Sequence, residues 1–109
     1  MGILDFLKGP NINEVMLKYH QLKYAVIVDV RDKEDFAKGR IPGSINVPLN
    51  NIGKVIYEVE DRNVPVFVCG WYLGDCKKGA SALRSLGYSS VTILGECERY
   101  TGEIEKDEE

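Results

Sequence analysis

The sequence predicts an α/β fold in which helices cover both faces of a central, mostly parallel sheet of about five strands. Apolar, β-branched segments alternate along the chain with segments of helical periodicity. These apolar segments are continuous, as is typical of parallel strands that are buried on both faces. The chain has 109 residues, of which 44% are hydrophobic and 28% charged. This size and composition suit one domain that needs no metal or disulfide to complete its core.

Four segments have the character of buried strands. The clearest is "YAVIVDV", residues 24–30, which is rich in β-branched residues and too short for a helix of its own. Residues 65–69 and 90–94 have the same pattern, and "SINV", residues 44–47, is a weaker candidate. Functional groups of parallel sheets gather where the strands end, so the residues after Val30 and after Val68 are candidates for a site.

Helical spacing of apolar residues separates these strands. It predicts helices over residues 12–22, 33–39, 49–60 and 76–88. Asn11 or Asn13 is a suitable N-cap for the first, and Asp75 for the last. Gly39 is expected to close the second helix and Gly87 the last one.

The chain is predicted to be a single domain over residues 1–109, with its core at about 11–103 and a disordered acidic tail at 104–109. Its net charge is −3 and no basic face is interleaved with aromatics, so nucleic acid is not an expected partner. No apolar run reaches about 18 residues, which argues against a membrane span. The segment "MGILDFLKGP" has no export pattern. The chain has three cysteines, and this odd number argues against a framework of disulfides. A cytoplasmic location with free thiols is therefore expected.

The segment "DVRDKEDFAKGRIPGSINVP", residues 29–48, resembles the opening motif of rhodanese-like domains. In that motif Asp-x-Arg ends a strand, a short helix follows, and a Gly-His-Ile-x-Gly-Ala-x-Asn-x-Pro segment comes next. Residues 83–100 are similar to the family's next helix, strand and Gly-Gly turn, and the likeness extends over about residues 11–103. The matching positions, which we expect to be structural, are Asp29, Arg31, Phe36, Gly39, Ile41, Gly43, Asn46 and Pro48, with Arg40 and Ser44 in place of His and Ala.

The resemblance implies a sulfurtransferase or sulfur carrier. In such enzymes a loop cysteine, cradled by backbone N–H groups, takes a sulfur atom from a donor and holds it as a persulfide. Cys69 is the candidate nucleophile, and Cys76 is a second candidate thiol because a helix start favours a thiolate. A small sulfur-containing anion, such as thiosulfate or polysulfide, or a protein thiol acceptor is the implied partner, with no cofactor or metal. The predicted substrate-binding loop is Gly70, Trp71, Tyr72, Leu73, Gly74 and Asp75.

Two departures from the family pattern support an alternative function. Counting from Pro65 and from Gly87 places Gly70, and not Cys69, in the nucleophile position. Successive strand side chains point to opposite faces, so this shift decides whether the sulfur faces the loop or the core. Asp75 also stands where many relatives carry arginine. The alternative is a catalytically inactive module that binds a protein partner through Trp71 and Tyr72; a cysteine phosphatase would need an arginine at position 75.

Overall fold

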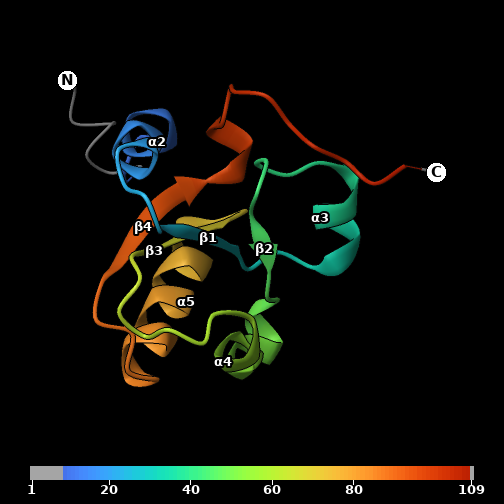
Figure 1. Cartoon of the computed structure of the whole chain (residues 1–109). Coiled ribbons are helices and arrows are strands. Elements are labelled where there is room, and N and C mark those ends of the chain that lie inside the picture. Colours follow the sequence, from blue (N-terminus) through green and yellow to red (C-terminus); the bar gives the residue numbers. More distant parts are fainter. Residues whose placement is uncertain (1–8, 109) are drawn as a thin grey trace.

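The computed structural model describes residues 9–108 and confirms the predicted α/β fold (Figure 1). Within these residues the sheet has four parallel strands rather than five, in the order β2-β1-β3-β4. Residues 1–8, which make up most of the segment expected to carry no export pattern, lie outside the described part. The strands are β1 (Val26–Asp29), β2 (Ile45–Asn46), β3 (Val66–Gly70) and β4 (Val91–Glu96).

Helices lie on both faces of the sheet, as predicted (Figure 1). One face is covered by α2 (Ile12–His20), whose N-cap Asn11 accepts a hydrogen bond from the Asn13 N–H at 3.0 Å. The opposite face carries η1 (Leu49–Lys54), α4 (Val55–Glu58) and α5 (Leu73–Ser85). Two shorter helices are α3 (Lys33–Lys38) and η2 (Cys97–Arg99). None of the helices in residues 9–108 is long and apolar enough to cross a membrane.

The strands divide their side chains between two cores. Val28 and Val68 pack beneath α4 and α5, whereas Ile27 and Phe67 pack on the other face against α2. This division follows from the two-residue period of a strand. As a result Cys69, two positions after Phe67, also faces α2.

The register of the strands brings three of their ends together. Asp29 of β1 is the partner of Cys69 in β3, and Cys69 is the partner of Gly95 in β4. The pairing shifts between Val68 and Cys69, because β4 contains one extra residue there. Gly95 has φ +136°, and a Cβ at this position would lie 2.9 Å from the Cβ of Ile12. Glycine therefore allows α2 to pack directly on the irregular end of β4.

The segment between α3 and β2 keeps part of the predicted turn. Gly43 has φ +82°, in the left-handed region that favours glycine, and the Ser44 N–H donates to the carbonyl of Ile41 at 3.1 Å. Gly39 is the C-cap of α3, as predicted, but its φ of 168° is extended backbone that any residue can adopt. Its carbonyl accepts a hydrogen bond from Arg31 Nη2 at 2.7 Å.

The last helix begins earlier than predicted. α5 starts at Leu73 rather than at Cys76, after Tyr72, whose side chain makes no capping hydrogen bond. The carbonyl of Tyr72 accepts the N–H groups of Asp75 and Cys76 at 3.0 and 3.1 Å. The backbone therefore starts the helix here, and the prediction that Asp75 is its N-cap is wrong.

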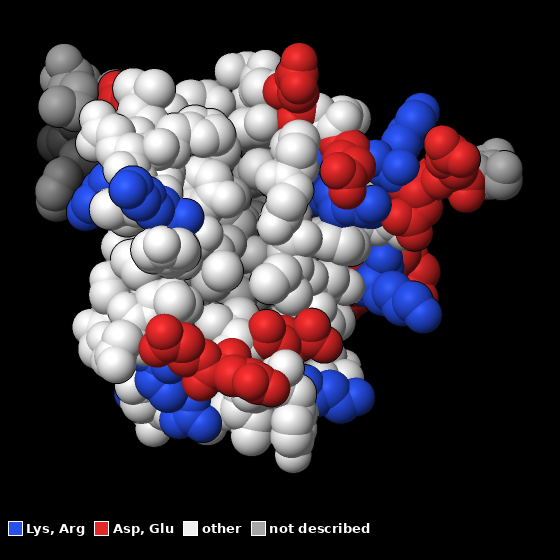
Figure 2. Space-filling model, viewed as in Figure 1, with Lys and Arg blue, Asp and Glu red and all other residues white. Residues whose placement is uncertain are grey.

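The acidic tail lies against the domain where the sequence predicts disorder. Residue 105 forms an antiparallel bridge with Arg40, through backbone hydrogen bonds of 2.8 and 2.9 Å. The Arg40 guanidinium also pairs with Glu105 at 3.1 Å and with Asp107 at 2.7 Å. Figure 2 shows acidic and basic side chains gathered together around this end of the chain. The tail is thus held up to Asp107, and Glu109 lies outside the described residues.

We predict that Gly95→Ala destabilises the domain by about 1–3 kcal/mol, because the new methyl group clashes with α2 and strains the backbone. Chemical denaturation measures this change. Gly74→Ala is the matched control, since a Cβ at Gly74 meets nothing within 4 Å and alanine favours a helix. Equal stability of the two variants would contradict the proposed close packing at Gly95.

Candidate functional site

A buried ion pair links the end of β1 to the chain that follows it. The carboxylate of Asp29 accepts hydrogen bonds from Arg31 Nε at 3.0 Å and from Nη2 at 2.7 Å, and from the Arg31 backbone N–H at 3.0 Å. Burial acts to lower the pKa of Arg31, but the hydrogen bonds and charge of Asp29 outweigh it, so that this pKa is raised. Arg31 is 7% exposed and stays charged at the ends of the strands.

The structure places Cys69 inside the sheet. Its side chain is 0% exposed and packs in the core under α2, not in the loop. A Cβ at Gly70 would point elsewhere, to within 3.6 Å of Cys76 Sγ. The Cys97 side chain and burial together raise the pKa of the Cys69 thiol well above its usual value. Cys69 is therefore a buried, protonated thiol, and the position after it has no side chain.

Cys76 is also a buried thiol, and it lies inside α5 rather than at its start. Its Sγ donates to the carbonyl of Gly95 at 3.5 Å. Burial, with a smaller effect of the charge of Cys97, raises the pKa of Cys76 to about 12. Cys76 thus lies past the helix start on which its expected thiolate depended, and burial favours its protonated form.

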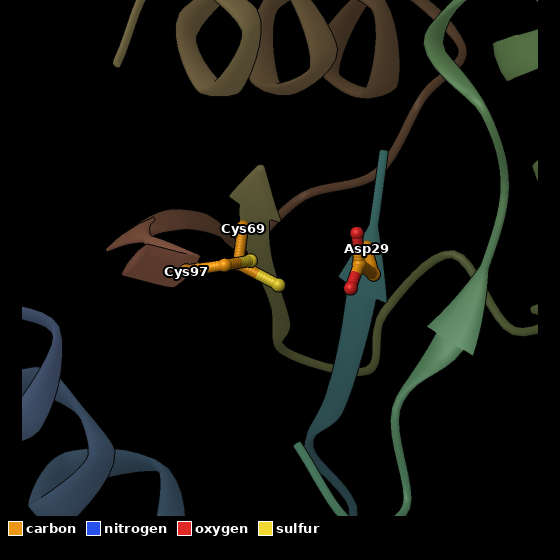
Figure 3. A group of neighbouring side chains, drawn as sticks. All are labelled: Asp29, Cys69 and Cys97. Atoms are coloured by element: carbon orange, nitrogen blue, oxygen red, sulfur yellow. The ribbon is translucent and has the colours of Figure 1, made fainter. Parts of the chain in front are cut away.

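Cys97, which follows β4, completes a cluster that the sequence did not identify. A carboxylate oxygen of Asp29 and the Sγ atoms of Cys69 and Cys97 all lie within 4.8 Å of one another. Figure 3 shows the three side chains converging from β1, β3 and the turn after β4. Of the three free cysteines only Cys97 is half-buried rather than buried. This cluster has the residue types of a metal site, but both Asp29 oxygens already accept hydrogen bonds from Arg31, whose charge opposes a cation.

The predicted substrate-binding loop is split between elements. Gly70 ends β3, while Leu73, Gly74 and Asp75 form the first turn of α5. Only Trp71 and Tyr72 connect the two, and they are 37% and 69% exposed. The N–H of Asp75 is engaged within the helix, so fewer amides face the loop than the sequence suggests.

A cavity of about 470 Å³ opens beside this loop. Asp32, Asp35 and Asp75 line it together with Arg31 and Trp71. The Trp71 Nε1–H donates to Asp35 at 3.0 Å, and the Arg31 guanidinium lies 4.6 Å from the centre of the indole ring. Within residues 9–108 no cysteine lines this cavity, and its carboxylates disfavour a small dianion.

A second cavity, of about 320 Å³, contains the half-buried thiol. Cys97 lines it with Arg31, Arg40, Trp71 and, from the tail, Ile104. Arg31 and Trp71 line both cavities and so stand between them. The structure therefore separates the acidic, loop-side cavity from a cavity lined by the Cys97 thiol, by Arg31 and Arg40, and by the carboxylate of Glu98.

Comparisons with known proteins agree with this fold. The model of the rhodanese-like domain family matches residues 12–96. The uncharacterized protein YibN of Escherichia coli K12 is 36% identical over 77 residues, which cover 66% of this chain and 52% of that protein. The thiosulfate sulfurtransferase GlpE of Pseudomonas fluorescens is 36% identical over 70 residues, covering 64% of this chain and 63% of that protein. The chain thus spans between about half and two thirds of the length of these relatives.

Solved structures show the same architecture. The crystal structure of a rhodanese-like domain protein from Staphylococcus aureus superposes with a TM-score of 0.76 at 23% identity. That match covers 89% of this chain and 95% of the other.

We predict that one thiol reacts much faster than the others in the native protein. A small maleimide should modify Cys97 first, because Cys69 and Cys76 are buried and have raised pKa values. Peptide mapping after a short exposure identifies the site, and the same reagent in denaturant should modify all three. Modification of Cys69 as fast as Cys97 would contradict the burial described here.

The raised pKa of Cys76 predicts a loss of stability in alkali. Its folded pKa is about 12 against a usual value of 9.0, so its contribution is complete below pH 9 and is lost as the pH rises from 9 to 12. Denaturant titrations between about pH 8 and about pH 11 should show wild-type stability falling more steeply than that of Cys76→Ser, by up to about 1.4 kcal/mol per pH unit. Parallel curves for the two proteins would count against a buried, protonated Cys76.

Proposed function

This chain belongs to the rhodanese-like domain family, and we propose that it carries sulfur as a cysteine persulfide that forms at the Cys69–Cys97 pair. The observation that supports this proposal is the half-buried Cys97 thiol in a cavity with Arg31 and Arg40, directly beside Cys69. A relative named thiosulfate sulfurtransferase suggests the class of donor. The persulfide expected on Cys69 would then be reached through Cys97, since Cys69 is 0% exposed.

The accessible thiol, Cys97, determines how a sulfur atom is transferred from the donor to the protein. The Cys97 thiolate attacks the outer sulfur of thiosulfate, an S–S bond to Cys97 forms, and the bond to the sulfonate breaks as sulfite leaves with the electron pair. The outer sulfur then passes to an acceptor thiol. If Cys69 attacks it, the persulfide moves to Cys69 and Cys97 becomes a thiol again. Polysulfide serves in the same way, with a shorter polysulfide as the leaving group.

Electrostatics favour the cavity of Cys97 over the loop-side cavity for an anionic donor. Arg31 interacts with the charges of both Cys97 and Cys69, so it stabilises a thiolate or persulfide anion at either sulfur. The loop-side cavity instead presents Asp32, Asp35 and Asp75 and no sulfur among its lining residues. One carboxylate, Glu98, lines the cavity of Cys97, against three in the loop-side cavity, so the cavity of Cys97 opposes a donor anion less.

A specific observation also supports the second candidate, a binding module without catalysis. Counting from Pro65 and from Gly87 places Gly70 in the position of the family's nucleophile, and the adjacent Trp71 and Tyr72 are exposed beside the acidic cavity. Exposed aromatics next to carboxylates suit a partner that presents basic side chains. This module would need none of its thiols.

Sulfur loading distinguishes the two candidates. After incubation with thiosulfate or polysulfide, intact mass spectrometry of the wild type should show the added mass of one sulfur atom. Cys76→Ser is the matched control and should load normally, whereas Cys97→Ser should load at least about 100-fold more slowly, because the remaining thiols are buried and largely protonated. Cys69→Ser should retain an adduct on Cys97.

Two results would contradict the proposal. No adduct on the wild type with either donor would favour the binding module. Undiminished loading of Cys97→Ser would place the entry of sulfur at another thiol.

A further inference from the structure

Cys69 and Cys97 face each other although 27 residues separate them in the sequence. Cys69 is held in β3, and its partner in β4 is Gly95, two residues before Cys97. Their Sγ atoms lie within 4.8 Å of each other, and Figure 3 shows the side chains converging. A disulfide requires the sulfurs to close to about 2.05 Å, so the two sulfurs must approach each other by less than about 3 Å.

The two sulfurs differ in their access to solvent. Cys97 is half-buried on the short helix η2, whereas Cys69 is 0% exposed behind it. A reagent from solution therefore meets Cys97 first, and Cys69 can attack only what is already attached to Cys97. This arrangement of one accessible thiol and one buried thiol behind it is the arrangement of an attacking and a resolving cysteine.

We propose that Cys69 and Cys97 form a reversible intramolecular disulfide by exchange with a small-molecule disulfide. In the first step the Cys97 thiolate attacks one sulfur of that disulfide, and a mixed disulfide forms as one small thiolate leaves. In the second step the Cys69 sulfur, on losing its proton, attacks Cys97 Sγ, and the second small thiolate leaves and takes up that proton. The two cysteines are oxidised, and the small disulfide is reduced to two thiols.

The charges around the pair support this order of steps. Interactions with Cys97 are among the causes that keep Cys69 protonated. Once Cys97 is a neutral mixed disulfide these interactions disappear, leaving burial and the charges of Asp29 and Cys76 to oppose ionisation of Cys69. Arg31 interacts electrostatically with both sulfurs, so its guanidinium stabilises the thiolate at each step.

Cys76 is the competing partner for Cys97 and is less suited to the role. Its Sγ is engaged by the carbonyl of Gly95 at 3.5 Å, and it lies within α5 on the opposite side of the sheet from the core that contains Cys69. Its pKa of about 12 has burial as the leading cause, which a mixed disulfide on Cys97 does not remove. The pairing therefore favours Cys69.

Oxidised glutathione tests this inference without any sulfane sulfur donor, so its outcome is independent of the persulfide proposal. After incubation, quenching in acid and alkylation in denaturant, the wild type should lose the mass of two hydrogen atoms and retain one alkylatable cysteine. Cys76→Ser should lose the same mass and retain none. Cys69→Ser should stop at a glutathione adduct on Cys97. Cys97→Ser should form an adduct much more slowly than the wild type reacts. Dithiothreitol should restore every thiol.

The wild type itself provides the check if a variant fails to fold. Cleavage after Trp71 or Tyr72 separates Cys69 from Cys76, so peptide mapping under non-reducing conditions shows directly which of them is joined to Cys97. A Cys69–Cys97 crosslink supports the inference. A Cys76–Cys97 crosslink, a lasting glutathione adduct on the wild type or on Cys76→Ser, or the absence of any oxidation would overturn it.

Discussion

The ion pair between Asp29 and Arg31 is the constraint on which the rest of the site depends. Both charges are buried, and their cost of desolvation is offset by bidentate contacts of 2.7–3.0 Å and by the carbonyl of Gly39. Asn46 reinforces the arrangement, since its Nδ2 donates to the carbonyls of both Asp29 and Arg31. The pair thereby joins β1 to β2 and to the end of α3. It also fixes the guanidinium that stacks on Trp71 and stands near two thiols.

The two-residue period of the strands then determines where sulfur chemistry is available. Phe67 and Cys69 share the face under α2, and Gly70 occupies the opposite face toward α5. A cysteine at position 69 therefore faces the core under α2, whereas a cysteine at position 70 would face the start of α5. The turn after β4 places Cys97 on the same side as Cys69. The site that we propose for sulfur chemistry thus lies on the side of the sheet that carries α2 and not at the β3–α5 loop.

The sequence predicts the fold and its opening motif well, because both are local. Buried strands, the Asp29 and Arg31 pair and the α2 cap at Asn11 are all encoded within short stretches. The start of α5 was missed because the backbone carbonyl of Tyr72, and not a capping side chain, receives the first helical N–H groups. The contact between Cys97 and Cys69 could not be predicted, because it depends on an extra residue in β4, and such a shift of register leaves no periodic pattern in the sequence.

The tail gives the domain a link between its ionic surroundings and its chemistry. Ile104 forms part of the wall around Cys97, and the residues that follow it are held to Arg40 by side-chain pairs with half or more of the acidic partner exposed. Dissolved salt screens exposed pairs of this kind within about 10 Å at 0.1 M. The mouth of this cavity is therefore bounded by a segment whose attachment weakens as ionic strength rises. The buried ion pair between Asp29 and Arg31, at the base of the cavity, is screened much less. Ionic strength thus acts on the surroundings of Cys97 through the end of the chain rather than through the core, and the backbone bridge between Arg40 and Glu105 limits how far the tail moves.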